Sequence, residues 1–135
     1  MYKRSVENIL KEALEISPSV LLSGARQVGK STLCLSLERD YRVFDNLTER
    51  EAALNDPAGY IDTLPKPIVL DEIQKVPEVL EGIKLNIDKE RINGTFLLTG
   101  SANVLDMKKA KETLAGRIIE IPMWPLSQKE LHFKA

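Results

Sequence analysis

The sequence has 135 residues, which is close to the usual size of one domain and long enough to bury a hydrophobic core. Its 19 basic and 20 acidic residues leave a net charge of −1, which excludes a protein that binds DNA, RNA or an anionic membrane through a strongly basic overall charge. No apolar run approaches the roughly 18 residues of a membrane span, and no secretory signal opens the chain, so we expect a cytoplasmic protein without membrane contact.

The single cysteine and the single histidine are too few for an internal disulfide or a zinc site. Cys34 lies among leucines, so we expect its thiol in the core, which fits a reducing compartment. We expect His132 on the surface. Gln74 and Lys75 are expected in a surface loop, and a contact with a partner or a polymer is the alternative.

The first expected elements lie on either side of a glycine-bracketed loop. Apolar residues at helical spacing predict a helix near residues 3–16, and the apolar run at 20–23 predicts a buried strand. A second helix is expected from Lys30 to about Arg39. The loop Gly24–Ser31 therefore follows a strand and opens a helix, which is where a phosphate-binding loop works.

This loop has the residue types that phosphate binding requires. Two glycines let the backbone curl so that successive N–H groups point at phosphate oxygens, and Lys30 would contact the β- and γ-phosphates. The Ser31 hydroxyl would contact Mg²⁺. A glycine-rich turn with a surface lysine is the alternative interpretation. The predicted nucleotide-binding residues in the loop are Gly24, Ala25, Arg26, Gln27, Val28, Gly29, Lys30 and Ser31.

The rest of the chain continues the alternation of strands and helices. The expected elements are a strand at 42–45, a capping box at Thr48–Glu51, a helix start at Asp56-Pro57, a strand at 67–70, a helix at 77–90, a strand at 95–99, a helix at 104–115 and a strand at 117–121. This order predicts a parallel sheet with helices on both faces and ligands at the carboxyl ends of the strands. We expect one domain, with an N-terminal helix in residues 1–17, a core in 18–121 and an exit segment in 122–135.

Two acidic residues end the third expected strand. Asp71 and Glu72 would emerge at the same edge of the sheet as Lys30 and Ser31. Asp71 would hold magnesium through Ser31 or a bound water, and Glu72 would orient or deprotonate the water that attacks the γ-phosphate. An acidic pair after a strand is also a common helix cap, and its position about 40 residues after the phosphate loop is what favours catalysis.

Polar residues also end the fourth strand and begin the fifth. Ser101 is the first candidate for a side chain that contacts the γ-phosphate, and Thr99 is the second; a helix cap is the alternative. Arg117 would lie at the rim of the domain, where it could reach the phosphates of a neighbouring subunit as an arginine finger. Its alternative is an exposed arginine that pairs with Glu120 or a helix end. The lysines at 108–111 are expected on a solvated helix face rather than at a nucleic-acid contact.

Four segments of the sequence resemble one family. They are GARQVGKSTL, IVLDEIQKVPEVL, FLLTGSAN and LAGRIIEIPMWPLSQKEL, in this order. Together they resemble the AAA-type ATPase domain that opens a family of bacterial and archaeal proteins with a C-terminal domain of unknown function, sometimes described as nuclease-like. The GKS string and the acidic pair occur throughout P-loop proteins, whereas DEIQKVPE and LTGSAN with LAGR are more specific to this family.

The resemblance covers essentially the whole chain and implies a fold and a set of site residues. The fold would be the three-layer α/β sandwich of P-loop NTPases, with a five-stranded parallel sheet in the additional-strand order 5-1-4-3-2. The ligands would be ATP or ADP with Mg²⁺. The implied site residues are Gly24, Gly29, Lys30, Ser31 and Thr32 for the nucleotide, Ser31 and Asp71 for magnesium, Glu72 for the water, Ser101 as sensor and Arg117 as a finger in a homo-oligomer. Family members continue beyond the fifth strand, so their lid and C-terminal domain are not expected in this sequence.

Four functions remain in competition at this point. The first is an ATPase that couples hydrolysis to a partner or an attached domain, and the second is a module that holds ATP or ADP as a switch without hydrolysis. A GTPase is disfavoured because its Asp-x-x-Gly string, Asp56–Gly59, follows a helical stretch rather than a buried strand. A small-molecule kinase would need an arginine-rich lid, which we do not find.

Overall fold

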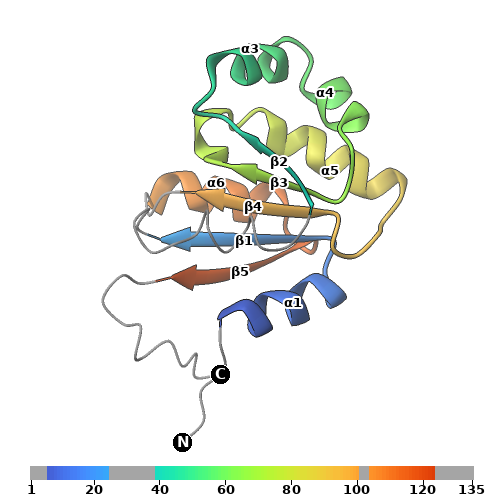
Figure 1. Cartoon of the computed structure of the whole chain (residues 1–135), viewed down its shortest axis with the longest axis vertical. Helices are drawn as coiled ribbons and strands as arrows, with labels where there is room; N and C mark the ends of the chain where they lie inside the picture. The colour runs from blue at the N-terminus through green and yellow to red at the C-terminus, as the bar shows by residue number, and fades with distance from the viewer. Residues whose placement is uncertain (1–5, 25–38, 101–103, 124–135) are drawn as a thin grey trace, which may run out of the picture.

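The computed structural model describes residues 6–24, 39–100 and 104–123. In these residues five parallel strands form one sheet in the order β2-β3-β4-β1-β5, which is the predicted order 5-1-4-3-2 read from the other edge (Figure 1). The strands are β1 (Ser19–Gly24), β2 (Asp40–Val43), β3 (Ile68–Asp71), β4 (Phe96–Gly100) and β5 (Ile118–Met123). The predicted α/β fold of P-loop NTPases is thereby confirmed.

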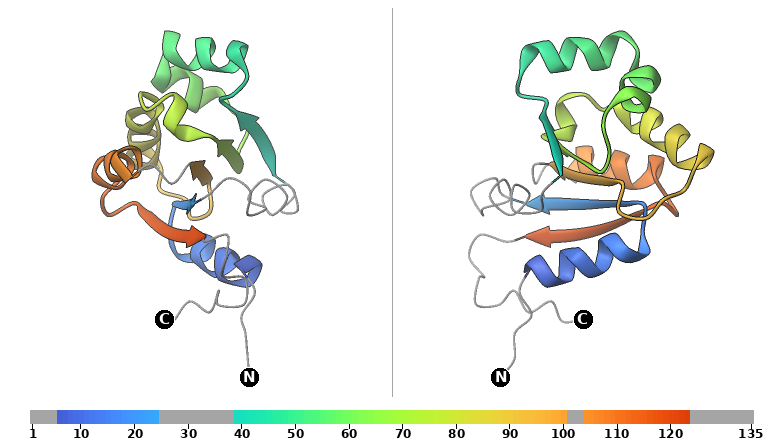
Figure 2. Two further views of the ribbon diagram at one scale, coloured as in Figure 1. Left: turned by 90° about the vertical axis from the view of Figure 1, so that its left-hand side faces the viewer. Right: turned by 45° about the vertical axis from the view of Figure 1, so that its right-hand side comes forward.

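Helices cover both faces of this sheet. The described helices are α1 (Val6–Ile16), α3 (Leu47–Asn55), α4 (Pro57–Thr63), α5 (Val79–Lys89), α6 (Val104–Thr113) and the short 3₁₀ helix η1 (Ile73–Lys75). Figure 2 shows α1 on one side of the sheet and α5 and α6 on the other. None of the helices in this part of the chain has the length and apolar character that a membrane crossing requires.

The strands have apolar side chains on both faces because each face packs against helices. On the α1 side, Leu10 and Leu14 pack against Val20, Leu22 and other strand residues. The opposite face has the larger core, which joins β3 and β4 to residues of α3, α4, α5 and α6. All residues of β3 and β4 are buried, so these two strands form the centre of the domain.

Two helix starts near the β2 edge refine the sequence predictions. The capping box at Thr48–Glu51 is wrong: α3 begins earlier, and the side chain of Asn46 accepts the cap hydrogen bond from the Glu49 N–H at 3.1 Å. The start at Asp56-Pro57 is correct, and Asp56 Oδ1 accepts from the Gly59 N–H at 3.2 Å. The Asp-x-x-Gly string that a GTPase would use is therefore the N-cap of α4 in this protein.

Glycine is required at the turn between α5 and β4. Gly94 has φ +81°, and its N–H donates to the Ser17 carbonyl at 2.9 Å while its carbonyl accepts from Arg39 Nη1 at 2.9 Å. A Cβ atom at Gly94 would lie 3.0 Å from the Leu14 carbonyl oxygen. Gly116 has nearly the same φ, +80°, but a Cβ atom there would meet nothing within 4 Å.

This pair separates backbone strain from crowding. We expect Gly116→Ala to lower the free energy of unfolding by about 1 kcal/mol, because alanine disfavours positive φ. Gly94→Ala should lower it by about 1 kcal/mol more, because the added methyl also meets the α1 backbone. Urea denaturation of both variants measures the difference, and equal losses would contradict the assigned crowding at Gly94.

Candidate functional site

Three parallel strands end at one edge of the sheet. β1 ends at Gly24, β3 at Asp71 and β4 at Gly100, and β4 lies between the other two (Figure 1). The register pairs Ser23 of β1 with Gly100 of β4. The acidic pair Asp71-Glu72 thus emerges at the edge where β1 leads into the glycine-bracketed loop, which is the arrangement that the sequence predicts.

The carboxylate of Asp71 lies between two hydroxyl donors from the neighbouring strands. The Tyr41 hydroxyl, from β2, donates to Asp71 Oδ2, and the Thr99 hydroxyl, from β4, donates to Asp71 Oδ1. Asp71 is 5% exposed and Thr99 is fully buried. A buried carboxylate strongly destabilises a fold unless its oxygens accept hydrogen bonds, and the two hydroxyls provide them.

Glu72 follows in a left-handed backbone conformation, with φ 61° and ψ 49°. This conformation costs a non-glycine residue about 1–3 kcal/mol and persists only where its surroundings hold it. Two contacts do so: the Glu72 N–H donates to Thr99 Oγ1 at 3.1 Å, and Glu72 Oε1 accepts from Gln74 Nε2 at 2.6 Å. Since Thr99 Oγ1 accepts from Glu72, its proton is directed at Asp71, so one hydroxyl orders both acids.

A third carboxylate, that of Glu120, holds the carboxyl end of β1. Ser23 is 5% exposed, and its hydroxyl donates to Glu120 Oε2 of β5 at 2.6 Å. The other oxygen of Glu120 lies 3.1 Å from Lys111 Nζ of α6.

The basic cluster on α6 lies on a solvated helix face, as the sequence predicts. The three lysines at 108, 109 and 111 are exposed, and Lys108 Nζ lies 3.9 Å from Glu112 Oε2.

Several predicted site residues lie outside the described residues. They are Ala25, Arg26, Gln27, Val28, Gly29, Lys30, Ser31, Thr32 and Ser101. Cys34, His132 and all but the last residue of the helix expected at 30–39 also lie outside the described residues. Their roles stay predictions. Gly24 is described as the last residue of β1, directly before this loop.

Arg117 lies at the other end of the sheet, just before β5 begins. Its Nε and Nη2 donate to the two carboxylate oxygens of Asp88 in α5, at 2.8 and 3.0 Å, and its Nη1 donates to the Ala115 carbonyl at 2.8 Å. The hydrogen bond from Arg117 lowers the pKa of the Asp88 carboxyl. Of the two partners in the alternative interpretation, Glu120 is not the one that Arg117 contacts, whereas the end of a helix is, since Asp88 lies in the last turn of α5. Within one chain Arg117 is at the opposite edge from the acidic pair.

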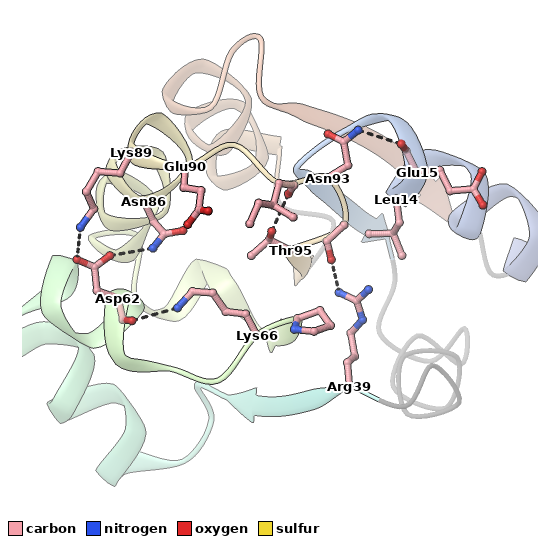
Figure 3. Close-up of a pocket in the computed structure, with 13 residues that line it drawn as sticks. Leu14, Glu15, Arg39, Asp62, Lys66, Asn86, Lys89, Glu90, Asn93 and Thr95 are labelled. Atoms are coloured by element: carbon pink, nitrogen blue, oxygen red, sulfur yellow. Dashed lines mark hydrogen bonds and ion pairs between the residues drawn. The ribbon is translucent and has the colours of Figure 1, made fainter.

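A cavity of about 920 Å³ also lies at this amino edge, away from the acidic pair (Figure 3). One lining residue, Lys66, donates to three backbone carbonyls at the end of α4, at 2.7–3.2 Å, and burial lowers its pKa. Asp62 accepts from Asn86 at 2.9 Å and from Lys89 at 2.6 Å, and these hydrogen bonds lower the pKa of Asp62. These contacts join the end of α4 to α5 and to the segment that leads into β3, so the polar side chains of Asp62 and Lys66 hold these elements together.

Sequence reasoning missed two residues of the site. The predicted strand at 42–45 does not include Tyr41, although the alternation of side chains in a strand that begins at 40 puts it on the face of Asp71. The sequence predicts a surface loop for Gln74 and Lys75. Instead, Gln74 binds Glu72, and Lys75 Nζ lies 3.1 Å from Asp45 Oδ1.

The residues at the acidic pair fit a magnesium ion. Mg²⁺ takes oxygen ligands and is usually held by one or two carboxylates together with the phosphates of a nucleotide. Asp71 provides such a carboxylate, buried and oriented at the edge where Gly24 lies. Among the residues that the structure describes, no three His, Cys, Asp or Glu side chains form a group that could hold a metal ion. In a magnesium site here, Asp71 would be one ligand beside the nucleotide phosphates, water and the predicted ligand Ser31.

Thr99 tests whether this hydrogen-bonded arrangement stabilises the fold. Thr99→Val keeps the side-chain shape but removes the hydroxyl that binds both acids, so we expect the free energy of unfolding to fall by about 1–3 kcal/mol. Thr99→Ser keeps the hydroxyl and should lose less. Urea denaturation measures both variants, and a valine variant as stable as the wild type would contradict the assigned contacts.

Comparison with known proteins identifies the family. The family described as AAA domain matches residues 17–132 of the chain. Uncharacterized proteins of Mycobacterium bovis and Mycobacterium tuberculosis are each 30% identical to it over 132 residues. The match covers 96% of this chain but only 30% of each relative, so the chain spans less than a third of the length of these curated relatives. With its parallel sheet in the 5-1-4-3-2 order and its acidic pair at the edge where β1 ends, the chain belongs to the AAA domain family of nucleotide-binding, ATPase-like domains.

Proposed function

We propose that this chain binds ATP with Mg²⁺ and hydrolyses it, and that the change of nucleotide acts on a partner or on a further domain. One arrangement carries the proposal: Gly24 and the acidic pair lie at the same edge of the sheet, with β4 between their strands. The loop at 24–31 follows Gly24 directly, so its predicted phosphate contacts would face the acids across one strand. The relatives are longer than this chain, and the idea of a further domain rests on that.

The proposed roles follow the chemistry of the residues. Lys30 and the backbone of the loop would bind the phosphates, and Ser31 with Asp71 would hold Mg²⁺. When bound, the ion neutralises charge on the β- and γ-phosphate oxygens. Ser101 would contact the γ-phosphate from the end of β4.

Glu72 is proposed to orient or deprotonate the attacking water. An ionised carboxylate has about four acceptor sites, so the amide of Gln74 on Oε1 leaves acceptors for a water. The bond to Gln74 and the bond from the Glu72 N–H to Thr99 limit the directions in which the carboxylate can turn. A fixed carboxylate that orients the attacking water contributes roughly 10²–10⁴-fold to a rate.

A second candidate is a nucleotide-dependent switch without hydrolysis. The observation that favours it is the 2.6 Å bond between Gln74 and Glu72, because an amide that stays on the carboxylate competes with water for it. Phosphate release measured in a single turnover separates the two functions: a switch binds ATP without releasing phosphate.

The first test is Glu72→Gln. We expect ATP affinity to stay within a fewfold of the wild type while the rate of phosphate release falls at least about 100-fold, because glutamine cannot accept a proton from water. Glu81→Gln, at an exposed position on α5, is the matched control and should keep the full rate. A Glu72→Gln variant that hydrolyses ATP as fast as the wild type would remove Glu72 from the proposal.

The second test concerns Arg117 as a finger for a neighbouring copy. If it acts in this way, the rate per subunit should rise with protein concentration, and Arg117→Ala should abolish the rise. Asp88→Ala removes only the ion-pair partner and leaves the guanidinium in place, so it should retain the rise. Equal loss in both variants would instead assign a structural role to the ion pair, and a rate independent of concentration would contradict action between subunits.

A further inference from the structure

Tyr41, Asp71 and Thr99 lie side by side on one face of the sheet. Val69 of β3 pairs with Tyr41 of β2 on one side and with Leu97 of β4 on the other. Because side chains alternate along a strand, Asp71 shares the face of Val69, and Thr99 shares the face of Leu97. Three adjacent strands therefore each contribute one polar side chain to the same place at the carboxyl edge.

The two hydroxyls fix the carboxylate of Asp71 from opposite sides. Tyr41 donates to Oδ2 and Thr99 donates to Oδ1, so rotation of the carboxylate would break both bonds. Without such partners this torsion is broad and poorly defined. The orientation of the Asp71 carboxylate, the proposed ligand of the divalent cation, is thus set by groups that need not touch the cation.

The two donors, Thr99 and Tyr41, differ in their other contacts. Thr99 is fully buried and also accepts from the Glu72 N–H, so its loss would disturb both acids. Tyr41 lies on the edge strand β2 and is only partly buried, with its ring against the α1-side core. The hydroxyl of Tyr41 can therefore be removed as Phe while the ring keeps its packing.

We propose that Tyr41 is a positioning residue for the divalent cation that accompanies the nucleotide. Its hydroxyl holds Asp71 in the orientation that binds the cation, directly or through a water, and Tyr41 itself touches neither cation nor phosphate. This inference rests on the proposed binding of ATP with Mg²⁺. Hydrogen-bond partners of metal ligands commonly change metal affinity by about 10–100-fold when they are removed.

The experiment is a titration of Mg²⁺ into the full chain with a fluorescent ATP analogue. For Tyr41→Phe we expect the apparent Mg²⁺ affinity to fall at least about tenfold, with the affinity for the analogue in EDTA unchanged within about twofold. Tyr60→Phe is the matched control, because its hydroxyl also donates to a carboxylate, but to Glu49 Oε1 of α3, at 2.5 Å, rather than to Asp71. It should titrate as the wild type does.

A double-mutant cycle tests whether Tyr41 acts through Asp71. In the Asp71→Asn background, Tyr41→Phe should change the Mg²⁺ titration by less than about twofold, because the carboxylate that it orients is already absent. An undiminished effect in this background would overturn the inference.

A measurement on the wild type covers the case in which Tyr41→Phe fails to fold. The chain has three tyrosines, so ¹³C labels on the hydroxyl-bearing ring carbon give three signals. Tyr2→Phe and Tyr60→Phe assign two of them, and the third is that of Tyr41. We expect the Tyr41 signal to shift when Mg²⁺ is added to the protein with ATP, and the Tyr60 signal to stay.

The outcomes separate the inference from the proposed function. A wild type without Mg²⁺-dependent binding of the analogue would overturn both. If the wild type binds with Mg²⁺, but Tyr41→Phe has the same Mg²⁺ dependence and the Tyr41 signal does not move, only the role of Tyr41 falls.

Discussion

The site depends on a carboxylate that is buried at the end of a buried strand. All four residues of β3 are buried, and Asp71 is only 5% exposed. The strands on both sides stabilise a carboxylate in this position by supplying donors, Tyr41 from β2 and Thr99 from β4. The strand order is therefore a chemical requirement as well as a packing arrangement, since another neighbour on either side would leave an oxygen of Asp71 without its donor.

The sheet could be predicted because its central strands have a strong pattern. The buried runs at β3 and β4 are bounded by prolines, acids or a turn, and their alternation with helices leaves few possible topologies. The edge strand β2 was predicted two residues late, because its burial is only partial and its apolar pattern is weak. Its position is set by pairing with β3, where Asp40 N donates to the Pro67 carbonyl at 3.3 Å and Phe44 N to the Asp71 carbonyl at 3.0 Å. Contacts of this kind are between distant segments and leave no local signal.

The site residues also differ in whether a local sequence pattern or a contact between distant segments determines their role. Asp71 and Glu72 can be predicted because they are consecutive acidic residues directly after a strand, at a typical distance from a phosphate loop. Tyr41 cannot, because its role depends on the register of β2 against β3. Gln74 cannot, because it reaches Glu72 only through the left-handed turn at residue 72. The partner of Arg117 depends on where the last turn of α5 lies relative to the start of β5, so the sequence indicates a helix end or Glu120 but does not identify Asp88.

The left-handed backbone at Glu72 means that conformational stability and chemistry favour different residues at this position. Glycine adopts φ 61° without the penalty that a glutamate side chain brings, so a chain that gave up the acid there would relieve a local strain. Conformational stability alone would therefore favour glycine over the glutamate that the proposed hydrolysis requires. Retaining glutamate at residue 72 then lowers thermodynamic stability in exchange for a carboxylate directly after Asp71.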